Sequence, residues 1–338
     1  MLKVKQLGVA AAIALFASAA MASNFRAADQ VYVPAAGHIV GANATFVSDL
    51  FISNLSDDSV DVSVILSQTP GGTQTPFPKV LTLLPRERRE LLDFIGNTLH
   101  LTSAFGQLIF NGCKATTDCT PDPTTGLNAN FRNISVESRI YSFATGSNQA
   151  TAPTNGQLFS GIPWYNFVSE SASGAGLDKI FITGIRNTPQ FKTNIGFVNA
   201  SQFSTTTLTA TLINGATGAT IGTNTFTLQP LGFQQVLIGS ANLFPGFTVA
   251  AASTNAYVTV SQSGTQPTAD AAANGCPTGC PAFFAYGSQL DNQTQDATTL
   301  EPQYLQPLTS NAITCIYAPD VATCKTGPSI HRAVKHQF

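Results

Sequence analysis

The chain has 338 residues, of which 43% are hydrophobic and only 10% charged, with 16 Lys and Arg against 18 Asp and Glu. Charge is far below the usual fraction of about 25% and forms no long basic stripe, so nucleic acid and anionic membrane surfaces are poor partners. The length predicts about two domains, and the hydrophobic content is enough for a large core.

The first 22 residues have the pattern of a signal peptide. Lys3 and Lys5 precede an apolar run from Leu7 to Ala20, and Ala20-Met21-Ala22 offers small residues for cleavage before Ser23. The run is shorter than the roughly 20 residues of a membrane-spanning helix. No cysteine stands at the cleavage point to carry a lipid. We therefore expect a secreted or periplasmic protein without a transmembrane anchor.

An internal repeat follows, with an offset of 145 residues. Residues 46–54 (FVSDLFISN) match residues 191–199 (FKTNIGFVN), and Leu83-Leu84-Pro85 matches Leu228-Gln229-Pro230. Between these two anchors, apolar and polar residues alternate over 60–67 and again over 207–212, as in a half-buried strand. Turn residues then follow in both copies, so each copy is predicted to hold a β-hairpin.

Further strands are predicted at matching places in the two copies, Gln107–Phe110 with Ala256–Ser261 and Ser135–Ser142 with Phe283–Gln289. Short strands, frequent turn signals and few helical patterns predict an all-β fold of two tandem immunoglobulin-like β-sandwich domains after the signal peptide. The expected domains are residues 28–148 and 157–300, joined by a linker at about Gly146–Gly161 and followed by a tail over 301–338. Each domain is expected to fold separately.

Two stretches of the second copy carry no charge, Thr205–Leu212 and Gly222–Leu228. A sheet edge made from either stretch would be poorly protected against pairing with another chain, whereas an interior strand would not be at risk. If such an edge is open, Asp29–Val33 of another molecule is one candidate to complete the sheet.

Six cysteines in an exported chain favour disulfide bonds over metal binding. They form three close pairs, Cys113 with Cys119, Cys276 with Cys280, and Cys315 with Cys324. Pairing of near neighbours is the expected connectivity because short loops close most easily. A zinc site made of the last four cysteines is the alternative.

The entry Val-Pro or Ile-Pro, the Phe-led strand ending in Asn-x-Ser, the hairpin and the Leu-x-Pro strand resemble secreted bacterial tandem-repeat β-sandwich proteins, a group without assigned activity. The resemblance spans residues 31 to 295 and rests on structural motifs. It implies an immunoglobulin-like fold and an extracellular location, and it brings no catalytic residues.

No catalytic motif or cofactor-binding motif is recognised, so we expect no enzyme activity, no cofactor and no metal centre. The clusters at Asp57, Asp58 and Asp61 and at Asp291, Asn292 and Asp296 leave calcium open as an alternative to solvated turns. The run from Arg86 to Glu90 has an uncharged counterpart in the second copy. It is either a solvated strand start or a docking patch of the first copy.

Trp164, Tyr165 and Phe167 stand together and either pack at the domain junction or stack on sugar rings, which makes Trp164 and Tyr165 candidate ligand-binding residues. The expected function is that of a secreted, non-enzymatic structural or adhesive protein of the cell surface or extracellular matrix that associates with itself or with other extracellular proteins. The alternative is a carbohydrate- or calcium-dependent binding module.

Overall fold

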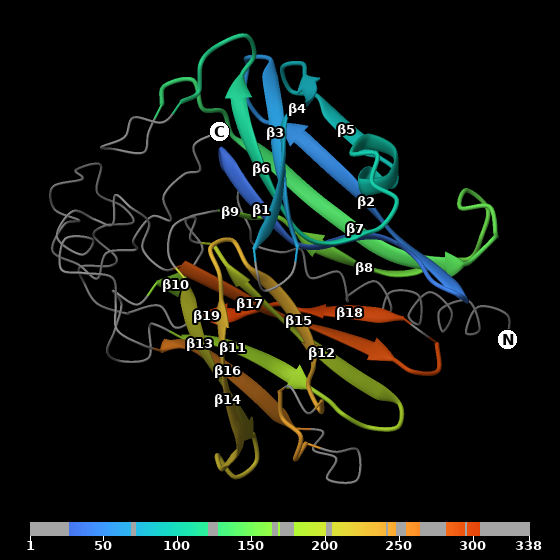
Figure 1. The fold of residues 1–338 in the computed structure, drawn as a ribbon, viewed down its shortest axis with the longest axis vertical. Helices are drawn as coiled ribbons and strands as arrows, with labels where there is room; N and C mark the ends of the chain where they lie inside the picture. Colours follow the sequence, from blue (N-terminus) through green and yellow to red (C-terminus); the bar gives the residue numbers. More distant parts are fainter. Residues whose placement is uncertain are drawn as a thin grey trace, which may run out of the picture.

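The structure is a computed structural model that describes residues 27–68, 72–120, 128–163, 168–169, 179–200, 205–240, 243–247, 255–263, 282–294 and 296–304. It is all-β, with antiparallel strands throughout (Figure 1). The strands are β1 (Gln30–Val40), β2 (Ala44–Asn54), β3 (Val60–Gln68), β4 (Thr73–Leu83), β5 (Arg88–Leu91), β6 (Ala104–Lys114), β7 (Ile134–Ala144), β8 (Asn155–Ser160), β9 (Ile162–Pro163), β10 (Val168–Ser169), β11 (Lys179–Ile185), β12 (Phe191–Asn199), β13 (Thr206–Asn214), β14 (Thr220–Leu228), β15 (Phe233–Leu237), β16 (Ala256–Ser263), β17 (Ala282–Asp291), β18 (Ala297–Leu300) and β19 (Gln303–Tyr304).

The internal repeat is confirmed by the order of the strands. One nine-stranded sheet runs β4-β3-β6-β1-β2-β7-β8, with β5 on β2 and β9 on β1. In the second half the same neighbours recur, except that β11 and β12 do not pair, so the strands form two five-stranded sheets, β14-β13-β16-β11-β19 and β10-β17-β12-β15 with β18 on β17, in which only β10 has no counterpart. Strands β1 to β9 therefore correspond one for one to β11 to β19, and we call these two sets the first and the second repeat.

The expected linker contains part of the first repeat. Strand β8 pairs with β7 along its whole length, and β9 pairs Ile162 with Tyr32 of β1. In the same way β19 of the expected tail pairs with β11. These short strands lack an alternating pattern of their own, and only their partners place them in the sheets.

The two sequence anchors of each repeat contact each other. The Asn54 side-chain amide donates to the Leu84 carbonyl at 2.8 Å, and the Asn199 amide donates to the Gln229 carbonyl at 2.9 Å. Asn54 and Asn199 thus hold the end of the hairpin to the strand before it, a contact that we call the Asn clasp. It explains why the Asn and the Leu-x-Pro motif recur at a fixed distance.

A second shared detail is the turn after each Leu-x-Pro motif. Arg86 and Leu231 follow the two prolines, and both adopt a left-handed backbone with φ of 59° and 54°. A left-handed non-glycine residue is uncommon, so its recurrence at the same place in both repeats indicates one inherited turn geometry.

The core consists of two clusters. One lies within the first repeat, where residues of β2 and β7 such as Leu50 and Val136 pack against residues of β3 and β6 such as Val62 and Phe110. The other fills the second repeat and continues across the boundary between repeats. Its members from the first repeat are Tyr32, Ala35, Ile65, Ile109, Phe159 and Ile162. The repeats are stacked end to end (Figure 1) and share this apolar cluster.

At the boundary, the turn at Leu231 of the second repeat packs on a sheet of the first repeat. Ile65, Ile109 and Tyr32 form the junction face, the outer face of β3, β6 and β1. On this face the Leu231 carbonyl accepts from the Ser67 hydroxyl and, at 2.7 Å, from the Gln107 amide. Because these polar groups are buried and bonded to each other, they fix how the repeats meet.

Within the described part of the chain, no helix has both the length and the apolar character needed to cross a membrane. The one helical segment there is η2 (Phe94–Thr98), a single turn that buries Phe94 and Ile95 in the core of the first repeat. The expected signal peptide over 1–22 lies outside the described residues.

Candidate functional site

The outer face of the second repeat carries rows of hydroxyl groups. Strands β14, β13 and β16 are paired so that side chains on this face stand opposite one another. Three cross-strand pairs place hydroxyl oxygens 3.1 to 3.5 Å apart, Thr207 with Thr227, Thr209 with Thr225, and Thr211 with Thr223. Thr259 and Ser261 of β16 extend two of these rows. We call these eight residues the hydroxyl face.

The hydroxyl face is the counterpart of the junction face. The pairings of Ile65 with Ile109 and of Thr211 with Thr259 occupy the same positions of the two sheets. In the first repeat this position is apolar and covered by the second repeat, with Ile109 fully buried. In the second repeat it carries threonine, which tolerates water. The substitution makes the second repeat an end of the stack, as capping repeats do in repeat proteins.

The opposite end of the stack is also polar. Leu231 and Phe233 of the second repeat are buried at or beside the boundary, and the Phe233 ring lies 5.6 Å from that of Phe105. In the first repeat the corresponding turn starts at Arg86, whose side chain is 64% exposed and pairs with Asp57 at 2.9 Å. The charged run from Arg86 to Glu90 therefore covers an end where the second repeat has a buried docking turn.

Strand β14 forms one edge of its sheet, and the outward direction of its amides follows from the hairpin. The Gly215 amide donates to the Asn255 carbonyl, so alternate residues of β13, including Thr209 and Thr211, turn their backbone groups toward β16. Their partners on β14 consequently point away from β13. The Thr225 amide, for example, donates to Oδ1 of the adjacent Asn224 at 2.8 Å.

A second group of polar residues lies in the first repeat beside η2. Nδ1 of His38 is 2.9 Å from each carboxylate oxygen of Asp93, and Asp93 adopts a left-handed backbone with φ of 43°. Oδ1 of Asp49 accepts from the Asp93 amide at 2.9 Å and from the Tyr141 hydroxyl at 3.1 Å. Burial raises the pKa of the Asp49 carboxyl above its ordinary value, although both hydrogen bonds oppose the shift.

This network is specific to the first repeat. From the strand registers, Asn187 and Asn194 correspond to His38 and Asp49. A carboxylate-bound imidazole is one part of a nucleophilic site, but no Ser, Thr or Cys of the described residues hydrogen-bonds His38. The arrangement accounts for how η2 is held in place. It was not foreseen from the sequence because its members are far apart along the chain.

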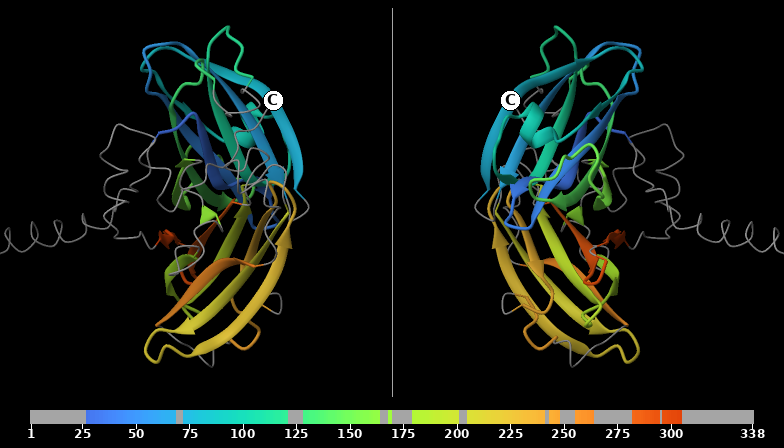
Figure 2. Two further views of the ribbon diagram at one scale, coloured as in Figure 1. Left: turned by 90° about the vertical axis from the view of Figure 1, so that its left-hand side faces the viewer. Right: turned by 90° about the vertical axis from the view of Figure 1, so that its right-hand side faces the viewer.

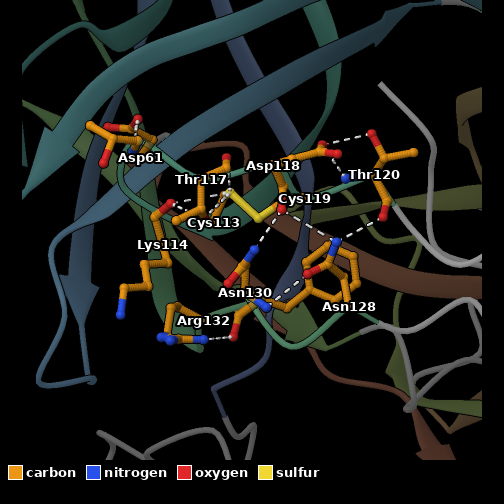
Figure 3. The surroundings of a disulfide bond; sticks show 12 residues. Asp61, Cys113, Lys114, Thr117, Asp118, Cys119, Thr120, Asn128, Asn130 and Arg132 are labelled. Atoms are coloured by element: carbon orange, nitrogen blue, oxygen red, sulfur yellow. Dashed lines mark hydrogen bonds between the residues drawn. A yellow bond between two sulfur atoms is a disulfide. The ribbon is translucent and has the colours of Figure 1, made fainter.

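The disulfide between Cys113 and Cys119 is present, as predicted (Figure 3). It ties the end of β6 to the following loop. In that loop Asp118 accepts from both the amide and the hydroxyl of Thr120, and the Asn130 side chain donates to the Asp118 carbonyl at 2.8 Å. The loop is thus held by its own polar groups as well as by the disulfide.

The acidic cluster of the first repeat is paired with basic groups. Asp58 contacts Lys114 at 3.0 Å and Arg132 at 2.7 Å, and hydrogen bonds from these two groups lower the pKa of Asp58. Asp61 contacts Lys79 at 2.8 Å. In the second repeat Asp291 caps a turn by accepting from backbone amides. No cluster of three or more acidic, His or Cys side chains in the described residues has the arrangement of a metal site.

Several predicted residues lie outside the described part of the chain. They are Trp164, Tyr165, Cys276, Cys280, Cys315 and Cys324. The proposed donor strand Asp29–Val33 falls almost entirely in β1, which already pairs with β6 and β9. It is therefore no longer a candidate to complete another sheet. Of the two uncharged stretches, Gly222–Leu228 lies in the edge strand, whereas 206–212 lies in an interior one.

No family model matches this chain, and no curated protein matches it. Among solved structures, one match is a β-glucuronidase of Parabacteroides merdae, at 10% identity and a TM-score of 0.14, covering 77% of this chain and 27% of that chain. A likeness at this TM-score supports no argument about fold or function.

Proposed function

We propose that the chain is a secreted, non-enzymatic structural or adhesive protein of the cell surface or extracellular matrix, built from two tandem immunoglobulin-like β-sandwich domains. The observation that carries the proposal is the uncharged edge strand β14 beside the hydroxyl face. An edge with outward amides and no charge is suited to pairing with another chain. Self-association of the mature protein is therefore the activity we expect.

The paired acids of the first repeat favour a calcium-independent form of this function. Asp57, Asp58 and Asp61 each contact a Lys or Arg, so their charge is already balanced within the fold. Calcium would have to displace these contacts to bind there. Adhesion through the backbone of β14 leaves these ion pairs in place.

Carbohydrate binding is the second candidate, and the flanks of the hydroxyl face favour it. Phe181 of β11 pairs with Thr259, and Tyr257 of β16 pairs with Ile213, so each aromatic residue lies beside a row of hydroxyls. Aromatic rings next to hydroxyl groups suit the stacking and hydrogen bonding that sugars require.

The mature protein from Ser23 should be measured by light scattering over a wide concentration range and on a glycan array. A mass that rises with concentration, unchanged by EDTA, supports the structural or adhesive role. A strictly monomeric protein that binds a defined glycan would support the second candidate instead. A monomer that adheres to nothing in either assay would contradict both.

A further inference from the structure

The first repeat contains the same edge strand in a protected form. Seven pairs from Thr206 with Leu228 to Leu212 with Gly222 run without interruption between β13 and β14, and the register shifts by one residue only beyond them, at Ile221 near the turn. Between β3 and β4 the register shifts by two residues after Val62, so β4 bulges there. The bulge contains Pro78 and Lys79, and a bulge, a proline and a lysine are the usual devices that stop edges from pairing.

A further proline protects the first edge at a matched position. Pro76 pairs with Ile65, and Thr223 pairs with Thr211, so Pro76 and Thr223 occupy the same place in the two repeats. Pro76 has no amide hydrogen that could be donated to the strand of another molecule. Thr223 has one, and it points outward. The two edges lie on the same side of the molecule (Figure 2), and at this position only the second offers an amide.

We propose that β14 pairs antiparallel with β14 of a second copy of this chain, which makes a dimer with two-fold symmetry. This inference rests on the proposed function and names the surface and the partner. Pairing a strand with itself is the self-complementary contact that closes a dimer. A pairing centred on Thr225 would set Thr223 of one copy opposite Thr227 of the other. Threonine side chains would then lie on both sides of the two-fold axis.

Other edges and ends of the described structure are less suited to this contact. Edge strand β5 carries Arg88, Arg89 and Glu90. The edge of β8 is covered by the second repeat, because Thr299 donates to the Leu158 carbonyl at 2.7 Å. End-to-end stacking is blocked by the charged turn at one end and by the hydroxyl face at the other. Among the uncharged edge strands of the described residues, β14 with nine residues is longer than β15 with five, so lateral pairing through β14 is favoured.

The dimer would join the hydroxyl faces of the two copies. Its ten-stranded sheet would run from β19 of one copy to β19 of the other, with β14 and β14 at the centre. Strands in a sheet are spaced by about 4.8 Å, so the threonine rows would continue across the dyad without a break. The hydroxyl face would thereby double in width.

The test compares Thr223→Pro with Thr223→Val in the otherwise unchanged mature chain. Thr223→Pro copies Pro76 and removes one outward amide, whereas Thr223→Val removes the hydroxyl and keeps the amide. We expect Thr223→Pro to weaken dimerisation at least about tenfold in sedimentation equilibrium, with Thr223→Val close to wild type. Circular dichroism confirms that both variants fold, and Pro76 shows that this fold accepts proline there.

Hydrogen exchange of the wild-type protein keeps the proposal testable if a variant fails to fold. Amides of β14 should become protected as concentration rises, while those of β4 should not change. Protection of β14 that is independent of concentration would overturn the proposal, because a segment of the same chain would then cover the edge. Self-association without protection of β14, or unaffected by Thr223→Pro, would overturn it and leave the proposed function standing. A strictly monomeric wild type would overturn both.

Discussion

Gln107 of the first repeat donates its side-chain amide to the Leu231 carbonyl of the second at 2.7 Å, in a part of the molecule closed to water. The bond joins two segments that sequence analysis assigns to separate domains. It lies within the apolar cluster that both repeats share. Loss of the second repeat would therefore expose Ile65 and Ile109 of the first to water. The repeats therefore depend on each other.

We expect the mature protein to unfold in one calorimetric transition, in contrast to the separate folding inferred from the sequence. Ile109→Ala should lower that transition and cost about 2–5 kcal/mol, the usual range for truncating a buried aliphatic side chain. Thr259→Ala is the matched control at the same position of the second repeat and should cost less than about 1 kcal/mol. Two independent transitions, or equal effects of the two variants, would contradict the shared core.

The second prediction concerns Asp49, whose pKa is raised by burial. A carboxyl whose pKa is raised in the folded state stabilises the protein at low pH. That contribution is lost as the pH rises from the ordinary carboxyl pKa of about 3.9 through the pKa in the folded state. Asp49→Asn keeps the two acceptor bonds and copies Asn194 of the second repeat. We expect it to stabilise the protein in urea at neutral pH, with a gain that shrinks as the medium becomes acidic enough to protonate Asp49 in the wild type.

Asp57→Asn is the control for the loss of a carboxylate, because that side chain is 87% exposed. It should leave the urea midpoint nearly unchanged at either pH. If Asp49→Asn destabilises the protein at neutral pH, the negative charge of Asp49 is needed for the network with Asp93 and His38.

Removing the Cys113–Cys119 disulfide should have a modest and local effect. The bridge closes a ring with a sequence separation of 6, for which the loop-closure model gives about 2 kcal/mol. Cys113→Ser with Cys119→Ser should lower the urea midpoint slightly and admit protease between β6 and β7. Mapping of unreduced peptides tests in the same preparation whether Cys276 pairs with Cys280. A loss of the whole fold would show that the bridge does more than secure its loop.

The last prediction is that calcium leaves the melting temperature unchanged. Asp58 is held by Lys114 and Arg132, and its lowered pKa means that these contacts stabilise the fold above the ordinary Asp pKa and are lost as pH falls. Melting curves in calcium, in EDTA and after Asp58→Asn are the measurement. A rise in melting temperature with calcium that Asp58→Asn removes would establish a calcium site.

Sequence patterns located most of the fold because the repeat displayed each strand twice. They missed β8 and β9, since Asn155–Ser160 has no alternation and only its pairing with β7 makes it a strand. They identified two uncharged stretches but not which one is the edge, because strand order depends on contacts far apart in sequence. His38, Asp49 and Asp93 escaped notice for the same reason. The contrast between Pro76 and Thr223 was visible in the sequence, but its meaning required the register.

The Asn clasp has a consequence for the length of the hairpin that it closes. Asn54 and Leu83 are as far apart in sequence as Asn199 and Leu228, although the strands between them differ. The second repeat has one more residue before β13 and one more within β14, at Ile221 where the register shifts, and it lacks the two residues that bulge β4. Because both ends of the hairpin are tied, residues gained at one place are offset by residues lost at another. The uninterrupted pairing of residues 222–228 of β14 and the two residues gained elsewhere in the hairpin are thus one change, so introducing the β4 bulge into this stretch requires removing those two residues as well.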